Sequence, residues 1–232
     1  MKSPILNNLC DLTSKSVNAL EILLSHVIDH VREYALVEGR VSSAKLDEHQ
    51  FETHSLAWIA TYIESLRQMH YWAEIAIKND KFDEIEKLLL QISFGEYLSQ
   101  IQSGIPMSQT EFARLKDMDL PATVLTDFLI PEVEMLSKFG NTQSARQYLV
   151  KLMQDGIGLS TFGFSGLDEE LEMVREQFRR FSNDKVDPYA HSWHLKDELI
   201  PLEIITEMAD LGVFGLTIPE EYGGLGLSKA AM

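Results

Sequence analysis

Apolar residues recur at intervals of three and four along most of the chain, a spacing that places side chains on one face of a helix. The first such stripe consists of Val17, Leu20, Leu24, Val27, Val31 and Tyr34. Gly39 lies just beyond it and suits a helix end. A second helix is predicted from Ser42 or Ser43, where a hydroxyl can cap the free N–H groups, to about Lys78. Such a helix is unusually long for a globular protein.

The same periodicity continues up to residue 155. Further helices are predicted over residues 82–102, 108–111, 121–139 and 142–154. Gly104 and Pro106 end the first of these, and Pro131 should break or kink the helix that contains it. We therefore expect residues 1–155 to form an antiparallel helical bundle.

The stretch that follows, DGIGLSTFGFSG, has four glycines and no helical period. We interpret residues 156–166 as a glycine-rich linker between two domains. Its glycines do not make the G-x-G-x-x-G pattern, and no strand–turn–helix unit surrounds them. A phosphate cradle is therefore disfavoured here.

Helical periodicity resumes at Leu167 and marks a second domain, residues 167–232. Its first stripe consists of Leu167, Leu171, Val174, Phe178 and Phe181. Acidic residues crowd the start of this helix and arginines its end, as the helix dipole favours. Pro201 can start a last helix, which Gly212 ends, and the predicted inner face of that helix carries Leu202, Ile205, Met208 and Leu211. Only residues 215–218 look locally strand-like, so the predicted fold class is all-α.

Composition and charge narrow the class of protein. The chain has 45% hydrophobic and 24% charged residues, which is ordinary for a soluble globular protein. The formal net charge of −16 disfavours attraction to nucleic acid and to anionic membranes. No apolar stretch approaches the roughly 20 residues that span a bilayer, so we expect no membrane span.

The cysteine content and the N-terminus bear on the compartment. Cys10 is the only cysteine, which excludes an intrachain disulfide and a thiolate metal site and fits a reducing compartment. Residues 1–20 contain no long apolar run of the signal-peptide kind, and they include Asp11 and no arginine. We therefore expect a cytoplasmic protein.

Other candidate constellations favour structural roles. His26 and His30 are four residues apart, with Glu33 nearby, but a solvated helix face is a better interpretation than a metal site. His191 and His194 are expected to pack or to face solvent. The aromatic cluster around Trp58, Tyr62, Tyr71 and Trp72 is expected to form bundle core and one partner surface. The sequence thus assigns no catalytic residue and no metal ligand.

Three consecutive segments of the second domain carry a resemblance. They are LDEELEMVREQFRRF, VDPYAHSWHLKDELIPLEIITEMADLG and the overlapping run LGVFGLTIPEEYGGLG. In this order they resemble the opening helical segment of the acyl-CoA dehydrogenase family. The resemblance covers about 60 residues, from Leu167 to about Ser228.

The resemblance implies a fold and an activity. Members of the family have a helical N-terminal domain, a central β domain and a C-terminal helical bundle, with flavin between the last two and a glutamate base in the C-terminal part. It implies that this chain is an N-terminal fragment of an FAD-dependent oxidoreductase of fatty acid metabolism, with the N-terminal domain incomplete. The intact flavoprotein would carry out α,β-dehydrogenation of an acyl-CoA, pass electrons to an electron-transfer acceptor and form a homo-oligomer. This chain alone is expected to hold no FAD and to be inactive.

The family signature also supplies the candidate site residues, which are Pro219, Tyr222, Gly223, Gly224 and Gly226. In the family this corner leads into helices that flank the acyl pocket, so these residues are expected to shape that pocket. Glycines allow positive φ and close backbone approach, and the proline stiffens the entry to the turn. The tyrosine ring is expected to be buried with its hydroxyl on a polar partner. The alternative for each residue is a rigid helix-to-helix corner and nothing more.

Residues 1–160 depart from the common family pattern, in which the acidic helix lies near the N-terminus. They look like the helical extension of some larger members. The segments SLAWIATYIESLRQMHYWAEIAI and FGEYLSQI are faintly similar to the long helix pairs of the family's C-terminal bundle. The alternative function is a non-catalytic helical module for protein interaction or assembly.

Overall fold

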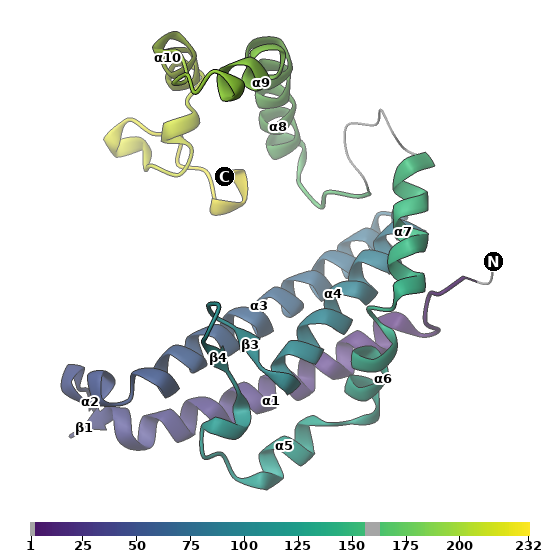
Figure 1. The fold of residues 1–232 in the computed structure, drawn as a ribbon, viewed down its shortest axis with the longest axis vertical. Helices are drawn as coiled ribbons and strands as arrows, with labels where there is room; N and C mark the ends of the chain where they lie inside the picture. The colour runs from purple at the N-terminus through teal and green to yellow at the C-terminus, as the bar shows by residue number, and fades with distance from the viewer. Residues whose placement is uncertain (1–2, 156–162) are drawn as a thin grey trace. The chain divides into compact units, whose positions relative to one another are not determined.

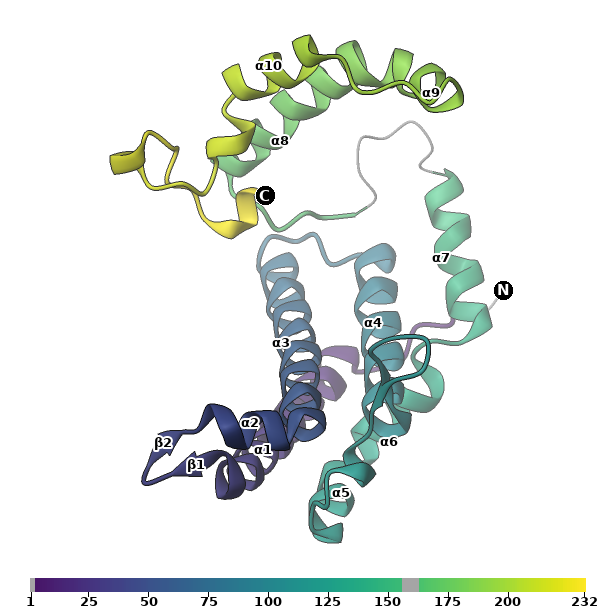
Figure 2. The same ribbon diagram turned by 60° about the vertical axis from the view of Figure 1, so that its left-hand side comes forward.

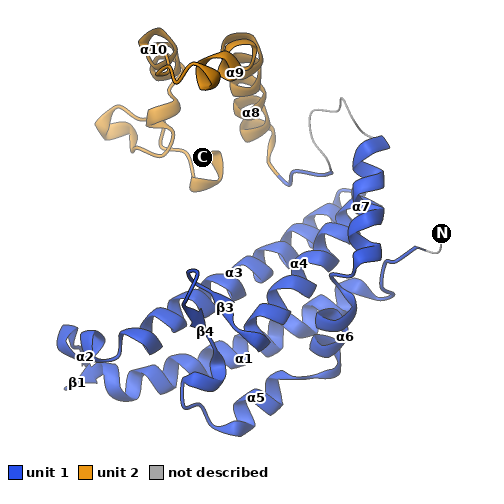
Figure 3. Ribbon diagram, viewed as in Figure 1, with its two compact units in different colours: residues 1–166 blue, residues 167–232 orange. Residues whose placement is uncertain are grey.

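The computed structural model describes residues 3–155 and 163–232. The chain divides into two compact units, residues 1–166 and residues 167–232 (Figure 3). Helices make up nearly all the regular structure of the described residues, so the predicted all-α class is confirmed. Of the predicted linker, residues 156–162 lie outside the described residues, and residues 163–166 belong to unit 1.

Three long helices form the body of unit 1. They are α1 (Leu9–Ala35), α3 (Gln50–Lys78) and α4 (Glu84–Ser103). They run side by side in alternating directions, and α3 packs against both of the others (Figures 1 and 2). The predicted antiparallel bundle is therefore confirmed. The side chains that are fully buried between these helices include Leu20, Leu23, Ile59, Ile63, Leu66, Phe94 and Leu98.

A tight hairpin and a short helix connect α1 to α3. Strand β1 (Leu36–Val37) pairs with β2 (Arg40–Val41) across a turn in which Glu38 and Gly39 both have positive φ. Helix α2 (Ser43–Glu48) follows, and the Ser42 hydroxyl accepts the N–H of Lys45 as predicted for its cap. The single long helix predicted to Lys78 is wrong, because the backbone of His49 leaves the helical region and separates α2 from α3.

The helix start at α4 is closed by a capping box. The Glu86 carboxylate accepts the backbone N–H of Asp83, and the Asp83 side chain in turn accepts the backbone N–H of Glu86. The helix ends at Gly104, whose φ of 134° few other residues adopt.

The predicted short helix at 108–111 is wrong. This segment is the turn between β3 (Ile105–Pro106) and β4 (Phe112–Ala113), and Met107 and Ser108 both donate their N–H groups to the carbonyl of Glu111. A short 3-10 turn, Leu115–Asp117, follows the hairpin.

Three shorter helices cover α1 and α4. They are α5 (Ala122–Phe128), α6 (Pro131–Phe139) and α7 (Gln143–Asp155). Pro131 lies in the first turn of α6, where its missing N–H costs nothing, so the predicted break is confirmed.

The backbone of α4 touches the junction between α6 and α7. A Cβ atom at Gly95 would lie 2.8 Å from the carbonyl carbon of Gly140 and closer still to the nitrogen of Asn141. One turn earlier, the buried amide of Gln91 donates to the carbonyls of Gly140 (3.1 Å) and Pro4 (3.2 Å) and accepts the N–H of Leu6 (2.7 Å). The N-terminal segment, α4 and α6 are thus joined at one point of the core.

Unit 2 consists of short helices and turns. Its elements are α8 (Glu169–Phe181), the π-helical turn η2 (Ser182–Val186), α9 (Asp187–Leu195), α10 (Leu202–Asp210), η3 (Val213–Gly215), η4 (Glu220–Tyr222) and η5 (Lys229–Ala231). The Asp168 carboxylate caps α8 by accepting the N–H of Leu171 at 2.9 Å. Residues 215–218, which look strand-like in the sequence, form turns instead. No described helix, in either unit, is long and apolar enough to cross a membrane.

Candidate functional site

The candidate corner closes by backbone hydrogen bonds between two short segments. Leu225, Gly226 and Leu227 donate their N–H groups to the carbonyls of Gly215 (2.9 Å), Ile218 (2.8 Å) and Leu216 (2.8 Å), in that order. Pro219 begins the turn between the segments, and its carbonyl accepts the N–H groups of Tyr222 and Gly224. The corner is therefore fixed by main-chain geometry.

The glycines of the corner meet different constraints. Gly223 has a φ of 83° but nothing lies within 4 Å of where its Cβ would be. At Gly224 a Cβ would lie 2.5 Å from the Cβ of Ile218 and even closer to the carbonyl oxygen of that residue. Gly226 has a φ of 63°, with the side chain of Glu220 at ordinary contact distance. Gly224 is thus required by space, and the other two by conformation.

The side chain of Tyr222 is exposed, although the sequence analysis expected its ring to be buried. Its side chain is 76% exposed, so the expected burial of its ring is wrong. The residue that the corner buries is Leu216, which is 6% exposed. The hydrophobic pattern of the sequence did not predict that Leu216 would be buried, because Leu216 does not belong to a helical stripe.

The glycine-rich segments do not fit flavin or another phosphate-bearing cofactor. A phosphate cradle needs several free backbone N–H groups that converge on one point. The N–H groups of residues 222–227 in the corner are used within the corner itself. In the other glycine-rich segment, residues 163–166, the N–H of Phe164 donates to the carboxylate of Glu86. The N–H groups of residues 222–227 and of Phe164 are therefore not free to bind the flavin phosphates.

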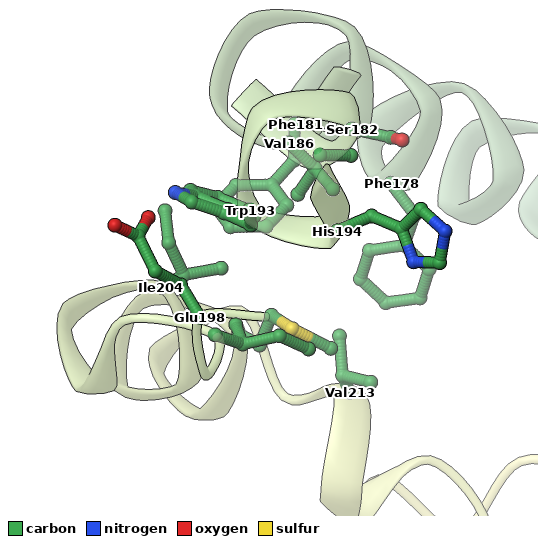
Figure 4. Close-up of a pocket in the computed structure, with 12 residues that line it drawn as sticks. Phe178, Phe181, Ser182, Val186, Trp193, His194, Glu198, Ile204 and Val213 are labelled. Atoms are coloured by element: carbon green, nitrogen blue, oxygen red, sulfur yellow. The ribbon is translucent and has the colours of Figure 1, made fainter. Parts of the chain in front are cut away.

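An apolar cavity of about 600 Å³ lies within unit 2, between α8, α9 and α10 (Figure 4). Its lining residues are Phe178, Phe181, Ser182, Val186, Ala190, Trp193, His194, Glu198, Ile200, Ile204, Met208 and Val213. Phe178 and Phe181 belong to the stripe predicted for α8. On α10 the predicted inner face is partly wrong, because Ile204 and Met208 line the cavity whereas Leu202 is 75% exposed.

None of the five corner residues lines this cavity. Val213, the last lining residue along the chain, lies just before the corner. His194, which was expected to pack or to face solvent, borders the cavity. Trp193 borders it too and stacks on Tyr189 with ring centroids 5.9 Å apart. That the corner shapes a pocket for the acyl chain stays a prediction.

Large apolar side chains around the cavity are exposed. Leu199 is 92% exposed, Leu195 70% and Ile200 57%. Within the described residues of unit 2, Leu216 is the only buried hydrophobic residue. Exposed apolar surfaces of this kind are typical of interaction sites.

Among the described residues of unit 1, a hydroxyl, an imidazole and a carboxylate lie in a row, as they do in sites of nucleophilic catalysis, and only the hydroxyl and the imidazole are within hydrogen-bond distance. The sequence analysis did not identify this cluster. The Thr13 hydroxyl lies 2.9 Å from Nδ1 of His70, and Nε2 of His70 lies 3.6 Å from Glu74. Thr13 is fully buried and also donates to the carbonyl of Cys10, so its hydroxyl cannot reach a substrate. Burial raises the pKa of the Cys10 thiol, which disfavours a reactive thiolate. This cluster is therefore structural.

The candidate metal face has no ligand set. His30 packs edge-on against Tyr34, and His26 and Glu33 face solvent. Across the described residues, no three His, Cys, Asp or Glu side chains come together in a group that could hold a metal ion.

Comparisons with known proteins place these elements in a family context. Residues 168–232 match the family model described as "Acyl-CoA dehydrogenase, N-terminal domain". The chain is 52% identical to (2S)-methylsuccinyl-CoA dehydrogenase of Cereibacter sphaeroides over 229 residues, which is 99% of this chain and 41% of that protein. Glutaryl-CoA dehydrogenase of Desulfococcus multivorans is 40% identical over 63 residues, 27% of this chain and 16% of that protein. Mitochondrial isobutyryl-CoA dehydrogenase of Dictyostelium discoideum is 31% identical over 97 residues, 40% of this chain and 23% of that protein. The chain thus spans less than half the length of each of these relatives.

Proposed function

We propose a function from the premise that this chain belongs to the acyl-CoA dehydrogenase family. The chain is the N-terminal region of a flavin-dependent enzyme, and that enzyme dehydrogenates an acyl-CoA thioester between Cα and Cβ. The observation that carries the proposal is the match to one dehydrogenase over 229 residues, 99% of the chain, which extends through both units. In such an enzyme the flavin supplies the hydride acceptor.

The described side chains support a structural contribution from this region. A catalytic base for the α proton needs a pKa raised toward neutrality and a fixed position beside the substrate. Two carboxyl groups have pKa values shifted the other way: hydrogen bonds from Arg179 and from Lys15 hold the pKa values of Glu176 and Glu132 below their ordinary range. Carboxylates of this kind stay ionised in solvent and accept protons poorly. We infer that the base and the flavin site come from other parts of the enzyme.

For the substrate we propose (2S)-methylsuccinyl-CoA. The match to the dehydrogenase named for it runs through the bundle of unit 1, whereas the matches to the glutaryl- and isobutyryl-CoA enzymes cover 63 and 97 residues. We further propose that the whole enzyme is a homo-oligomer and passes its electrons to an electron-transfer acceptor. The exposed apolar face of unit 2 supports a large protein contact in the assembled enzyme.

The test uses the complete gene product, purified with its flavin and mixed without oxygen with each of three thioesters. We expect (2S)-methylsuccinyl-CoA to bleach the flavin absorbance faster than glutaryl-CoA or isobutyryl-CoA does. Faster bleaching by another thioester would contradict the substrate and leave the reaction class intact. A gene product that holds no flavin, or whose flavin none of the thioesters bleaches, would contradict the proposed function.

The second candidate is a non-catalytic interaction or assembly module. It is favoured by the exposure of Leu199, Leu195 and Leu202 on unit 2, which a binding partner could cover. The same flavin experiment separates the two candidates, because an interaction module would copurify with a partner protein and show no flavin absorbance.

A further inference from the structure

The last four residues of the glycine-rich stretch cross the end of the α3–α4 hairpin. The indole N–H of Trp72, on α3, donates to the carbonyl of Phe164 at 3.0 Å. The N–H of Phe164 donates to the carboxylate of Glu86, on α4, at 2.8 Å. Both backbone groups of one residue are thus held by side chains from two different helices.

The two glycines that flank this residue are explained by the same contacts. Gly163 has a φ of 85°, and a Cβ there would lie 2.9 Å from the carboxylate of Glu86. Gly166 has a φ of 79°, and a Cβ there would lie 2.8 Å from the indole of Trp72. Conformation and space therefore both require glycine at each end. A flexible linker would need neither a fixed positive φ at these glycines nor a close approach of their backbone to Trp72 and Glu86.

Both carboxylate oxygens of Glu86 accept backbone hydrogen bonds. The residue is only 4% exposed, and its second carboxylate oxygen accepts the N–H of Asp83 in the capping box of α4. A buried carboxylate is costly unless its oxygens are hydrogen-bonded. Here Asp83 and Phe164 each supply one N–H, so removing residues 163–166 would leave one oxygen of Glu86 without that donor.

We propose that Gly163–Gly166 is a strap, latched by Trp72 and Glu86, that ties the polypeptide leading into the acyl-CoA dehydrogenase segment to the bundle of unit 1. Residues 163–166 therefore belong with the bundle, and unit 2 begins at Leu167, directly after the strap. Trp72 and Glu86 are positioning residues, and the strap holds whether or not the proposed enzymatic function does.

The test compares two tryptophan variants of the whole chain, Trp72→Phe and Trp58→Phe. Each removes one indole donor from α3 and keeps an aromatic ring. The indole of Trp58 donates to His54 on its own helix and does not contact the strap. We measure hydrogen exchange at the Phe164 amide, which reports opening of the latch.

In the unaltered chain the Phe164 amide should be protected. Trp72→Phe should raise its exchange rate by about five- to tenfold, the effect of losing one hydrogen bond, and Trp58→Phe should leave it unchanged. A second variant, Gly166→Ala, leaves the core intact and should open the latch as well. The proposal is overturned if the Phe164 amide is unprotected in the unaltered chain. It is equally overturned if Gly166→Ala and a folded Trp72→Phe protein both exchange there at the unaltered rate.

Discussion

Replacing Gly95 by alanine is expected to destabilise the bundle by about 2–3 kcal/mol. The new methyl group would meet backbone atoms of Gly140 and Asn141, which cannot rotate away as a side chain could. Relief would require α4 to move from the α6–α7 junction and would break the hydrogen bond from Gln91 to Gly140. Urea denaturation followed by circular dichroism measures the change in the free energy of unfolding.

The predicted loss of stability is opposite in sign to the usual effect of replacing glycine by alanine in a helix. At an unobstructed helix position, glycine to alanine stabilises by about 1 kcal/mol, because alanine is the better helix former. Ser103→Ala, at an exposed position at the end of the same helix, is the matched control and should change stability little. A Gly95→Ala protein as stable as the unaltered chain, or more so, would mean that α4 does not touch this junction.

Gly224→Ala is expected to disrupt the candidate corner far more than Gly223→Ala. A methyl group at residue 224 would overlap the backbone of Ile218, and the corner could close only if its hydrogen-bonded segments moved apart. At residue 223 the neighbouring space is open, so the cost is that of a positive φ, about 1 kcal/mol. The two positions are adjacent and chemically identical, which makes each the control for the other.

The measurement is made on the complete enzyme, as kcat/KM together with thermal stability. The prediction follows from our proposal that the corner shapes the acyl pocket of the complete enzyme. Since a displacement of about 1 Å in the framework of an active site can cost about a hundredfold in rate, we then expect Gly224→Ala to lose about that much or to fail to fold. Gly223→Ala should fold and keep most of its activity. Equal effects of the two substitutions, or normal activity of Gly224→Ala, would contradict the proposed geometry of the corner.

Helix-ending residues made much of the fold predictable. Pro131 and Gly104 end or begin helices where the sequence placed them, because their backbone preferences are local. The break at His49 was missed, since no glycine or proline marks it. The segment 108–111 was misassigned for a related reason: the hydroxyl and carboxylate that suggest a helix start also stabilise a turn, where Ser108 bonds to Glu111.

The remaining errors depend on contacts between distant residues. The strap binds Trp72 and Glu86, which are 92 and 78 residues from Phe164 in sequence, so composition alone indicated only a linker. At the candidate site, the family resemblance is confirmed by the match over residues 168–232 and by the relative that covers both units. The resemblance singled out these glycines, and the pocket-shaping role that it implies stays a prediction. It could not show that Gly224 is required by space or that Tyr222 faces solvent.

The central claim is that this region has a structural role in the proposed enzyme, and that other parts of the enzyme supply the flavin site and the catalytic base. The most direct test of this claim is to measure whether the chain itself binds flavin. The purified chain is incubated with excess FAD, free cofactor is removed by gel filtration, and the visible spectrum is recorded. We expect no flavin absorbance to remain, because the backbone N–H groups of the corner, and that of Phe164 in the strap, are already hydrogen-bonded within the chain. A retained flavin spectrum that bleaches on addition of an acyl-CoA would contradict the account.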